Sequence, residues 1–208
     1  MAYADFYTNF HLFMRWLHVI AGIAWIGHLY FFNFVNVPLQ GALDDAAKKA
    51  VNPKLMPRAL WWFRWGAMVT FLAGLILFTM IYMYTPGMGF GPSASFSDEM
   101  GVTGRGVWIL MGMLLGTIMW FNVWFVIWPI QKKILSGRAS AEELPALRKR
   151  AGLFSRTNTY LSGPMLFGML AANHYSAING ATLIVFVAVS LAAVWVAIFH
   201  AGRVGQSV

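Results

Sequence analysis

The chain has 208 residues, a formal net charge of +8 and no cysteine. Apolar residues make up 59% of it and charged residues only 11%, and the mean hydropathy is +0.63. Since a soluble domain carries about twice that share of charge, this composition indicates an integral membrane protein. The lack of cysteine excludes disulfides, thiolate metal sites, iron–sulfur clusters and a covalently attached c-type haem within this chain.

Five apolar runs are long enough to cross a bilayer, which takes about 20 residues of helix. They cover residues 10–37, 60–84, 107–130, 153–175 and 181–201. We therefore expect an all-α integral membrane protein, with residues 1–208 forming a single membrane domain. The predicted fold is an antiparallel bundle of five transmembrane helices, in which the fifth helix packs outside the other four. The first run is too long for a cleavable signal peptide, and no internal repeat is apparent by eye.

The basic residues predict the orientation of this bundle. Most of them lie in the segments 37–59 and 131–152 and in the C-terminal tail, which share one side of a five-helix bundle. By the positive-inside rule the N-terminus is outside and the C-terminus is cytoplasmic, as in a multi-pass protein of the bacterial inner membrane. Topology and contact with the lipid bilayer thus account for the net charge, and we expect no nucleic acid partner.

Two loops stand out by composition. The segment 85–106 is rich in glycine, proline and serine, and it is predicted to form an ordered cap or a docking surface on the outer side. The segment 140–150 begins with a helix-cap signal at Ser140 and has acids before bases, which favours a helix. Because Pro145 limits the length of such a helix, we expect a short one along the cytoplasmic face.

His18 is the main clue to function, because it falls near the middle of the first apolar run. An imidazole in hydrocarbon is costly unless something binds it. His11, Arg15 and His18 share one stripe of the predicted helix. One interpretation of His18 is a core histidine bonded to a neighbouring carbonyl. The other is an axial ligand of a b-type haem held between helices.

A second histidine strengthens the haem hypothesis. His174 ends the fourth predicted helix on the outer side, so helices one and four are expected to grip haem b, with His18 and His174 as iron ligands. Arg15 and His11 are further cofactor-binding candidates. Arg15 is suited to a haem propionate or an anionic substrate, although it can equally snorkel to the headgroups.

His28 lies on the inner half of the first helix and is also a cofactor-binding candidate. Together with His200 it allows a second haem, so the expected cofactor is one haem b or two. His200 has a plainer interpretation as an interfacial residue at a helix C-terminus, where a positive charge is favoured. No carboxylate lies inside an apolar run, which argues against a buried acid relay and leaves the catalytic residues unknown.

Four segments resemble, in order, the membrane domain of the bacterial cytochrome-c-linked urate oxidase (urate hydroxylase) family. They are RWLHVIAGIAWIG, WWFRWGAMVTFLAG, GTIMWFNVWFVIWPIQKKIL and RTNTYLSGPMLFGMLAANHY. The matched positions are Arg15, His18, Trp62, Trp65, Asn122, Asn158, Asn173 and His174. In that family a C-terminal cytochrome c domain follows, and it is expected to be absent here. The resemblance therefore implies electron transfer to a separate cytochrome c. A weaker likeness is to haem-binding membrane proteins that oxidise protoporphyrinogen.

Three functional hypotheses remain. The first is a haem-b redox protein that passes electrons from a quinol, urate or another small reductant to cytochrome c or other membrane redox subunits. The second is a non-catalytic accessory subunit of a larger respiratory or oxidase complex. The third is a small-solute channel or transporter, against which the lack of paired broken helices argues. We favour the first; whether the chain is an enzyme, as a urate oxidase-like oxidoreductase, stays open.

Overall fold

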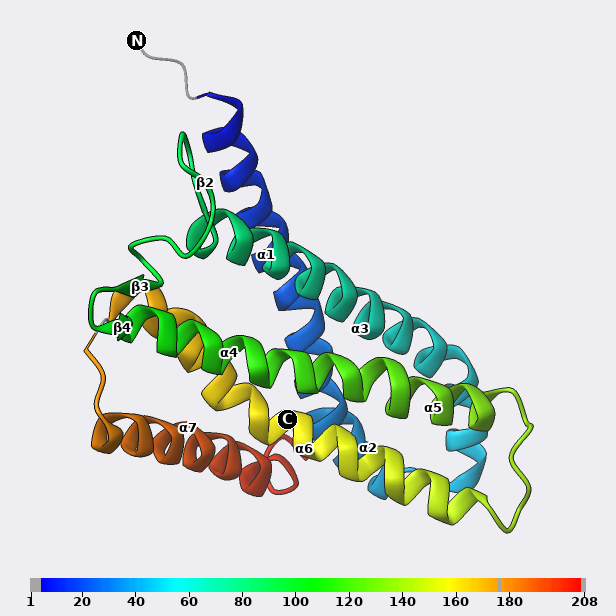
Figure 1. Cartoon of the computed structure of the whole chain (residues 1–208). Coiled ribbons are helices and arrows are strands. Elements are labelled where there is room, and N and C mark those ends of the chain that lie inside the picture. Colours follow the sequence, from blue (N-terminus) through cyan, green and yellow to red (C-terminus); the bar gives the residue numbers. More distant parts are fainter. Residues whose placement is uncertain (1–4, 176, 207–208) are drawn as a thin grey trace.

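The computed structural model describes residues 5–175 and 177–206, and most of them are helical. Figure 1 shows long helices joined by short connections, with two small hairpins at one end. The elements are α1 (Phe6–Tyr30), η1 (Phe31–Asn36), α2 (Val37–Ala42), α3 (Asp45–Tyr82), β1 (Tyr84–Thr85), β2 (Gly89–Phe90), β3 (Ser97–Asp98), β4 (Gly101–Val102), α4 (Gly104–Phe121), η2 (Asn122–Ile127), α5 (Trp128–Leu135), α6 (Leu144–His174) and α7 (Gly180–Ala201). The segments η1 and η2 are single π-helical stretches that continue one helix into the next.

Four of the described helical segments are long and apolar enough to cross a membrane: Phe6–Ala42, Asp45–Tyr82, Gly104–Leu135 and Gly180–Ala201. The fifth long helix, α6, is the most polar of the long helices. The chain is thus an all-α, multi-pass membrane protein, as predicted. The inside–outside orientation stays a prediction, but the two ends of the bundle differ in their loops. The basic end carries the connections after α2 and α5, and the hairpin end carries β1–β4.

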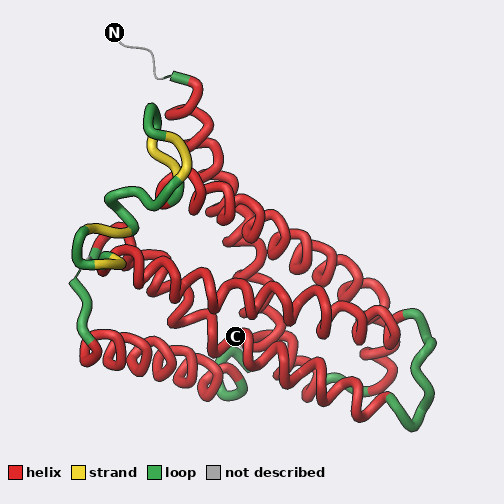
Figure 2. Tube along the Cα trace, viewed as in Figure 1, coloured by secondary structure: helices red, strands yellow, loops and turns green. Residues whose placement is uncertain are grey.

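The helices form two antiparallel pairs with one helix outside. α1 packs mainly against α3, and α4 packs mainly against α6. In Figure 2 the two pairs are close at the basic end, and the N-terminal part of α1 projects away from α4 and α6. α7 contacts α6 and η1 but buries only Val194, so the predicted peripheral place of the last helix is confirmed.

The connection into α6 differs from the prediction. Ser140 and Glu143 do form a capping box: the Glu143 N–H donates to the Ser140 hydroxyl, and the Ser140 N–H donates to the Glu143 carboxylate. However, no separate surface helix follows. Pro145 stands in the first turn of α6, where a missing N–H costs nothing, and the helix runs on unbroken to His174. Proline was therefore wrongly interpreted as limiting the helix.

The structure also shows a repeat that is not apparent by eye. Each half consists of a long helix, a six-residue π-helical segment, a short helix with proline in its first turn and a long returning helix. The pattern Phe-Val-x-x-Pro-x-Gln occurs over 34–40 and again over 125–131. Pro-x-Leu-x-x-Arg-Ala-x-x-aromatic-x-Arg occurs over 53–64 and 145–156. α1 and α4 start at the same end of the bundle, so the two halves are parallel repeats.

Polar contacts inside the apolar core join the helices of the second half and link that half to the first. The Asn122 amide donates to Asn158 Oδ1 at 2.8 Å, and the Asn158 amide donates to the Met119 carbonyl at 2.9 Å. The Tyr30 hydroxyl lies 2.9 Å from the Ser162 hydroxyl, which links α1 to α6. Asn158 and Ser162 are fully buried. Asn122 thus bonds a residue of another helix, as a buried amide inside a membrane bundle must.

Two β-hairpins form most of the glycine-rich loop. β1 pairs with β2 and β3 pairs with β4, both antiparallel. Gly87, Gly89 and Gly101 have positive φ angles, which only glycine adopts without strain. The loop is therefore ordered, as the prediction of a cap or a docking surface requires.

Replacing Asn158 by alanine is expected to destabilise the bundle by about 1 to 2 kcal/mol, because the Asn122 amide then loses its buried acceptor. Thermal unfolding of the detergent-purified protein measures the loss. The matched control is Thr157→Ala, at the exposed position just before it. Equal melting temperatures for the two variants would show that the network contributes no stability.

Candidate functional site

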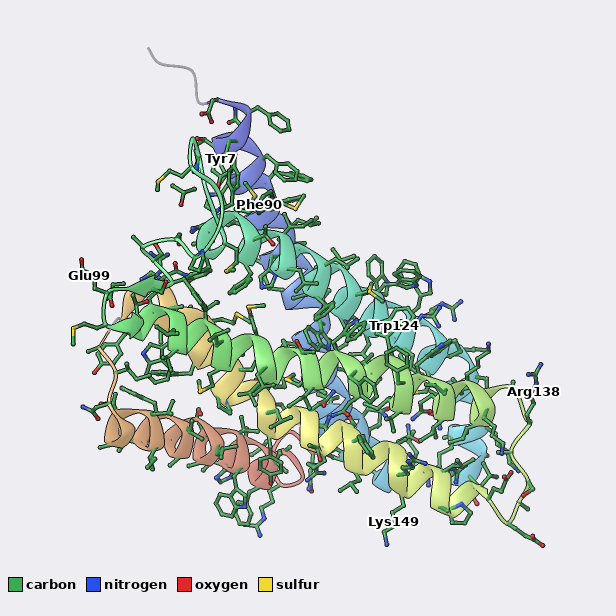
Figure 3. The ribbon with its side chains drawn as sticks, viewed as in Figure 1. Tyr7, Phe90, Glu99, Trp124, Arg138 and Lys149 are labelled. Carbon is green, nitrogen blue, oxygen red and sulfur yellow. The ribbon has the colours of Figure 1, made fainter. Side chains whose placement is uncertain are left out.

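His18 lies where α1 meets α3, and its side chain is half-buried. Figure 3 shows the side chains that these helices carry. Its Nδ1 is 2.9 Å from the Thr70 carbonyl oxygen. A carbonyl only accepts hydrogen bonds, so Nδ1 must carry the proton, and the lone pair of the neutral ring is on Nε2. This is the arrangement in which metal-binding histidines are usually held, with one nitrogen fixed by a protein acceptor and the other available.

The α3 surface under His18 is built from small residues. A Cβ added to Gly74 would lie 3.0 Å from His18 Cε1, so the ring packs directly over this glycine. The Thr70 hydroxyl donates to the Gly66 carbonyl at 2.7 Å, and the Thr70 carbonyl accepts the hydrogen bond from the imidazole. Gly66, Thr70 and Gly74 are spaced four residues apart, so they share one face of α3. This face sets the position of His18.

His11 and Arg15 form a separate pair nearer the N-terminus. Arg15 Nε donates to His11 Nε2 at 3.1 Å, so that lone pair is used within α1. The Tyr7 ring stacks on His11 with centroids 6.4 Å apart. Arg15 is exposed. In this arrangement His11 is less suited than His18 to bind iron, although both lie on the predicted stripe.

His28 repeats the His18 pattern within its own helix. Its Nδ1 donates to the Ala24 carbonyl at 2.7 Å, which again leaves Nε2 as the acceptor nitrogen. His200 is exposed, and its ring meets Phe199 edge-on. In the part of the chain that the structure describes, no hydrogen bond or ring contact joins His28 to His200.

His174 is the last residue of α6 and is exposed. The hydrogen bond of His18 goes to α3, and no hydrogen bond or ring contact joins His18 to His174 within residues 5–175 and 177–206. Moreover, α1 packs mainly on α3 and has only minor contacts with α6. The pairing of His18 with His174 across one cofactor therefore stays a prediction.

Arg105 is a polar centre that the sequence did not single out. Its Nε donates to the Tyr82 hydroxyl at 3.3 Å, one terminal nitrogen to the Ser95 hydroxyl at 3.4 Å and the other to Asn173 Oδ1 at 2.9 Å. One side chain thus joins α3, the hairpin loop, α4 and α6. The available signal was that Arg105 is the lone cation of its loop.

A cluster of aromatic residues surrounds Arg64 toward the basic end. The Arg64 Cζ lies 3.7 Å from the centroid of Trp128, and the Trp124 indole donates to the Arg64 carbonyl at 3.1 Å. Trp65 meets Trp124 edge-on at 5.5 Å. Trp62, another matched position of the resemblance, is exposed and packs edge-on against Trp61. The cluster lies on α3, η2 and α5, away from His18.

No group of three or more histidine, cysteine or acidic residues that could hold a metal ion is found among the described residues. The donor set is therefore unsuited to a bare metal ion with several protein ligands, which takes about four. A haem needs only one or two axial ligands from the protein. Two buried indole N–H groups, of Trp25 and Trp120, also lack an acceptor in the described part.

The fold and these side chains define a helical membrane protein with intramembrane histidines. A family model described as "Urate oxidase N-terminal" matches residues 4–50, 39–90 and 92–207. The chain belongs to this family, as its four quoted segments predicted. No curated protein and no solved structure matches the chain.

Replacing Arg105 by glutamine is expected to loosen the hairpin loop, because hydrogen bonds from a charged donor each contribute about 1.5 to 3 kcal/mol. A loss of about 1.4 kcal/mol raises the open population roughly tenfold. Limited proteolysis of the segment 83–103 measures this as faster cleavage. Arg138→Gln, in the connection at the opposite end, is the control, and cleavage unchanged from wild type in Arg105→Gln would contradict the assignment.

Proposed function

We propose that this protein is a haem-b-binding redox protein of the bacterial inner membrane that passes electrons to a separate cytochrome c. The observation that carries the proposal is the geometry of His18. Its Nδ1 is fixed by the Thr70 carbonyl, which leaves Nε2 as a lone-pair nitrogen inside a membrane helix pair. A polar ring at this depth needs a partner, and iron is the partner that a neutral imidazole nitrogen binds.

The chain supplies binding and orientation. His18 would hold the iron, and the glycine-lined face of α3 keeps the ring in one orientation. His28, whose Nε2 is also available, and the exposed His174 are the candidates for further ligands. When bound, haem b supplies one-electron transfer. Arg15 lies one turn from His18 on α1 and suits a propionate or an anionic reductant, although it bonds His11 in this structure.

The support for urate as a reductant comes from the family match, which relates this chain to urate oxidases. Urate is an anion, and Arg15 and Arg105 are the cations nearest the hairpin end. Arg105 is held by neutral acceptors and has no carboxylate within ion-pair distance in the described part of the chain. We therefore propose urate or a quinol as the electron donor, and a soluble cytochrome c as the acceptor.

One observation favours the second hypothesis, an accessory subunit of a respiratory or oxidase complex. α7 buries only Val194 against the rest of the chain and leaves large apolar side chains such as Trp195 and Phe199 exposed. Such a helix suits contact with another membrane subunit as well as with lipid. Haem content decides between the two hypotheses.

Replacing His18 by alanine is expected to abolish haem binding while the protein still inserts into the membrane. The readout is the reduced-minus-oxidised spectrum of the purified protein, with a pyridine haemochrome assay for stoichiometry. His200→Ala is the control and is expected to keep the full spectrum, because His200 is exposed.

Two outcomes would count against the assignment. A full haem spectrum in His18→Ala would exclude His18 as a required ligand. A wild-type protein without haem, produced with haem available, would exclude the redox function and leave the accessory subunit. The variant Gly74→Val adds an independent check, since its side chain must displace the His18 ring and therefore weaken binding without removing the ligand.

A further inference from the structure

Arg64 is a cation without a counter-ion at the edge of the membrane. It lies four residues into the apolar run 60–84, and its Nε is buried with no hydrogen-bond partner in the described chain. The ion pairs of the described residues join Lys48 to Asp45 and Lys133 to Glu143, so neither involves Arg64. Only Nε is covered by the chain, and Arg64 as a whole is half-buried, so the rest of its guanidinium can reach an acceptor from outside the chain.

The guanidinium is nevertheless held in place. It stacks over Trp128 at 3.7 Å and lies 6.0 Å from the centroid of Trp124. Three neighbouring tryptophans, Trp61, Trp62 and Trp65, are 46, 56 and 40% exposed. Exposed tryptophans gather at the level of the lipid headgroups. We therefore expect Arg64 at the depth where the acyl chains give way to phosphates.

A basic hollow lies beyond Trp128 on the same element. It measures about 370 Å³ and is lined by Pro129, Lys132, Lys133, Ser136 and Arg138. Lys132 is one turn after Trp128, so the two share a face of α5 and are about 6 Å apart along its axis. Arg64, which stacks on Trp128, is therefore followed by the hollow in the direction of the basic loop.

The charges of the hollow remain largely uncompensated. The Lys133 ammonium donates to Glu143 at 2.7 Å, and this bond, together with the Ser140 N–H, lowers the pKa of Glu143. That carboxylate consequently stays charged and neutralises Lys133. No ion pair of Lys132 or Arg138 is found in the described part of the chain. Lys132 and Arg138 in the hollow and Arg64 beside Trp128 are therefore three cations without a counter-ion in the described part of the chain.

We propose that Arg64, Lys132 and Arg138 form a binding site for the phosphate headgroup of an anionic phospholipid. The acyl chains would lie along the exposed tryptophans, and the headgroup would fill the hollow. The arrangement favours a lipid over a free phosphate, because Arg64 lies on the apolar side of the hollow and an inorganic ion gains nothing from the tryptophans. The site is independent of haem binding.

The second repeat supplies a matched control. Arg156 occupies in α6 the position that Arg64 occupies in α3, within the same sequence pattern. Among the described residues, no aromatic ring lies under the Arg156 guanidinium as Trp128 lies under Arg64. Arg156→Gln thus removes a charge from the equivalent position of the repeat, at a residue that does not line the hollow or stack on Trp128.

The test is native mass spectrometry of the delipidated full chain, titrated with phosphatidylglycerol or with phosphatidylcholine of the same chains. The wild type is expected to bind phosphatidylglycerol preferentially. Each cation that is removed should weaken binding about fivefold, since a basic residue near an anionic lipid contributes about 1 kcal/mol. Lys132→Gln and Arg64→Gln are each expected to reduce this preference about fivefold, and Arg156→Gln to leave it unchanged.

Three results would overturn the proposal. They are equal binding of the two lipids by the wild type, unchanged phosphatidylglycerol binding in Lys132→Gln, and displacement of the lipid by millimolar inorganic phosphate, which would assign the site to the free ion. Lys132 is exposed, so its variant answers the question even if Arg64→Gln does not fold.

Discussion

The close approach of α1 and α3 is the contact on which the candidate site depends. Lipid tails are as apolar as leucine, so membrane helices associate by packing and hydrogen bonds and not by the hydrophobic effect. Gly66 permits this approach, because a Cβ there would lie 3.0 Å from the Trp25 backbone nitrogen. The next residues on the same face are Thr70 and Gly74, which bond and support His18. A side chain in place of Gly66 would push the helices apart and withdraw the carbonyl that orients the imidazole.

The other half uses the same device with different residues. A Cβ on Gly168 would lie 2.9 Å from the Trp108 carbonyl, and one on Gly112 would lie 3.1 Å from the Met169 nitrogen. In each half, the first helix (α1 or α4) continues into a π-helical segment, and a short helix with proline in its first turn follows. The N–H groups of Val37 and Trp128 reach back five residues, and the proline that follows has no N–H to place. The wider turn thus absorbs the proline without breaking the helix.

Sequence alone was sufficient for the class and for most helix positions, because apolar runs of this length are typical of membrane-spanning helices. The sequence was insufficient to place a helix end where one residue type occurs in two structural roles. Pro145 can end a helix or begin one, and only the capping box of Ser140 and Glu143 decides in favour of the beginning. The repeat is not apparent by eye because its matching positions are few and are spread over two separate sequence patterns. Arg105 was missed because its partners come from three distant segments.

The repeat also bears on how many cofactors the bundle can hold. Counted from the shared Phe-Val-x-x-Pro-x-Gln pattern, Ile109 stands where the first half has His18, and Met119 stands where it has His28. The face of α3 that supports His18 is likewise changed, since Leu166 and Ser162 replace Gly74 and Thr70 in the second pattern. The duplicated scaffold therefore does not duplicate the site. The second half offers no histidine at the positions equivalent to His18 and His28, so the proposed haem site has no symmetry-related copy.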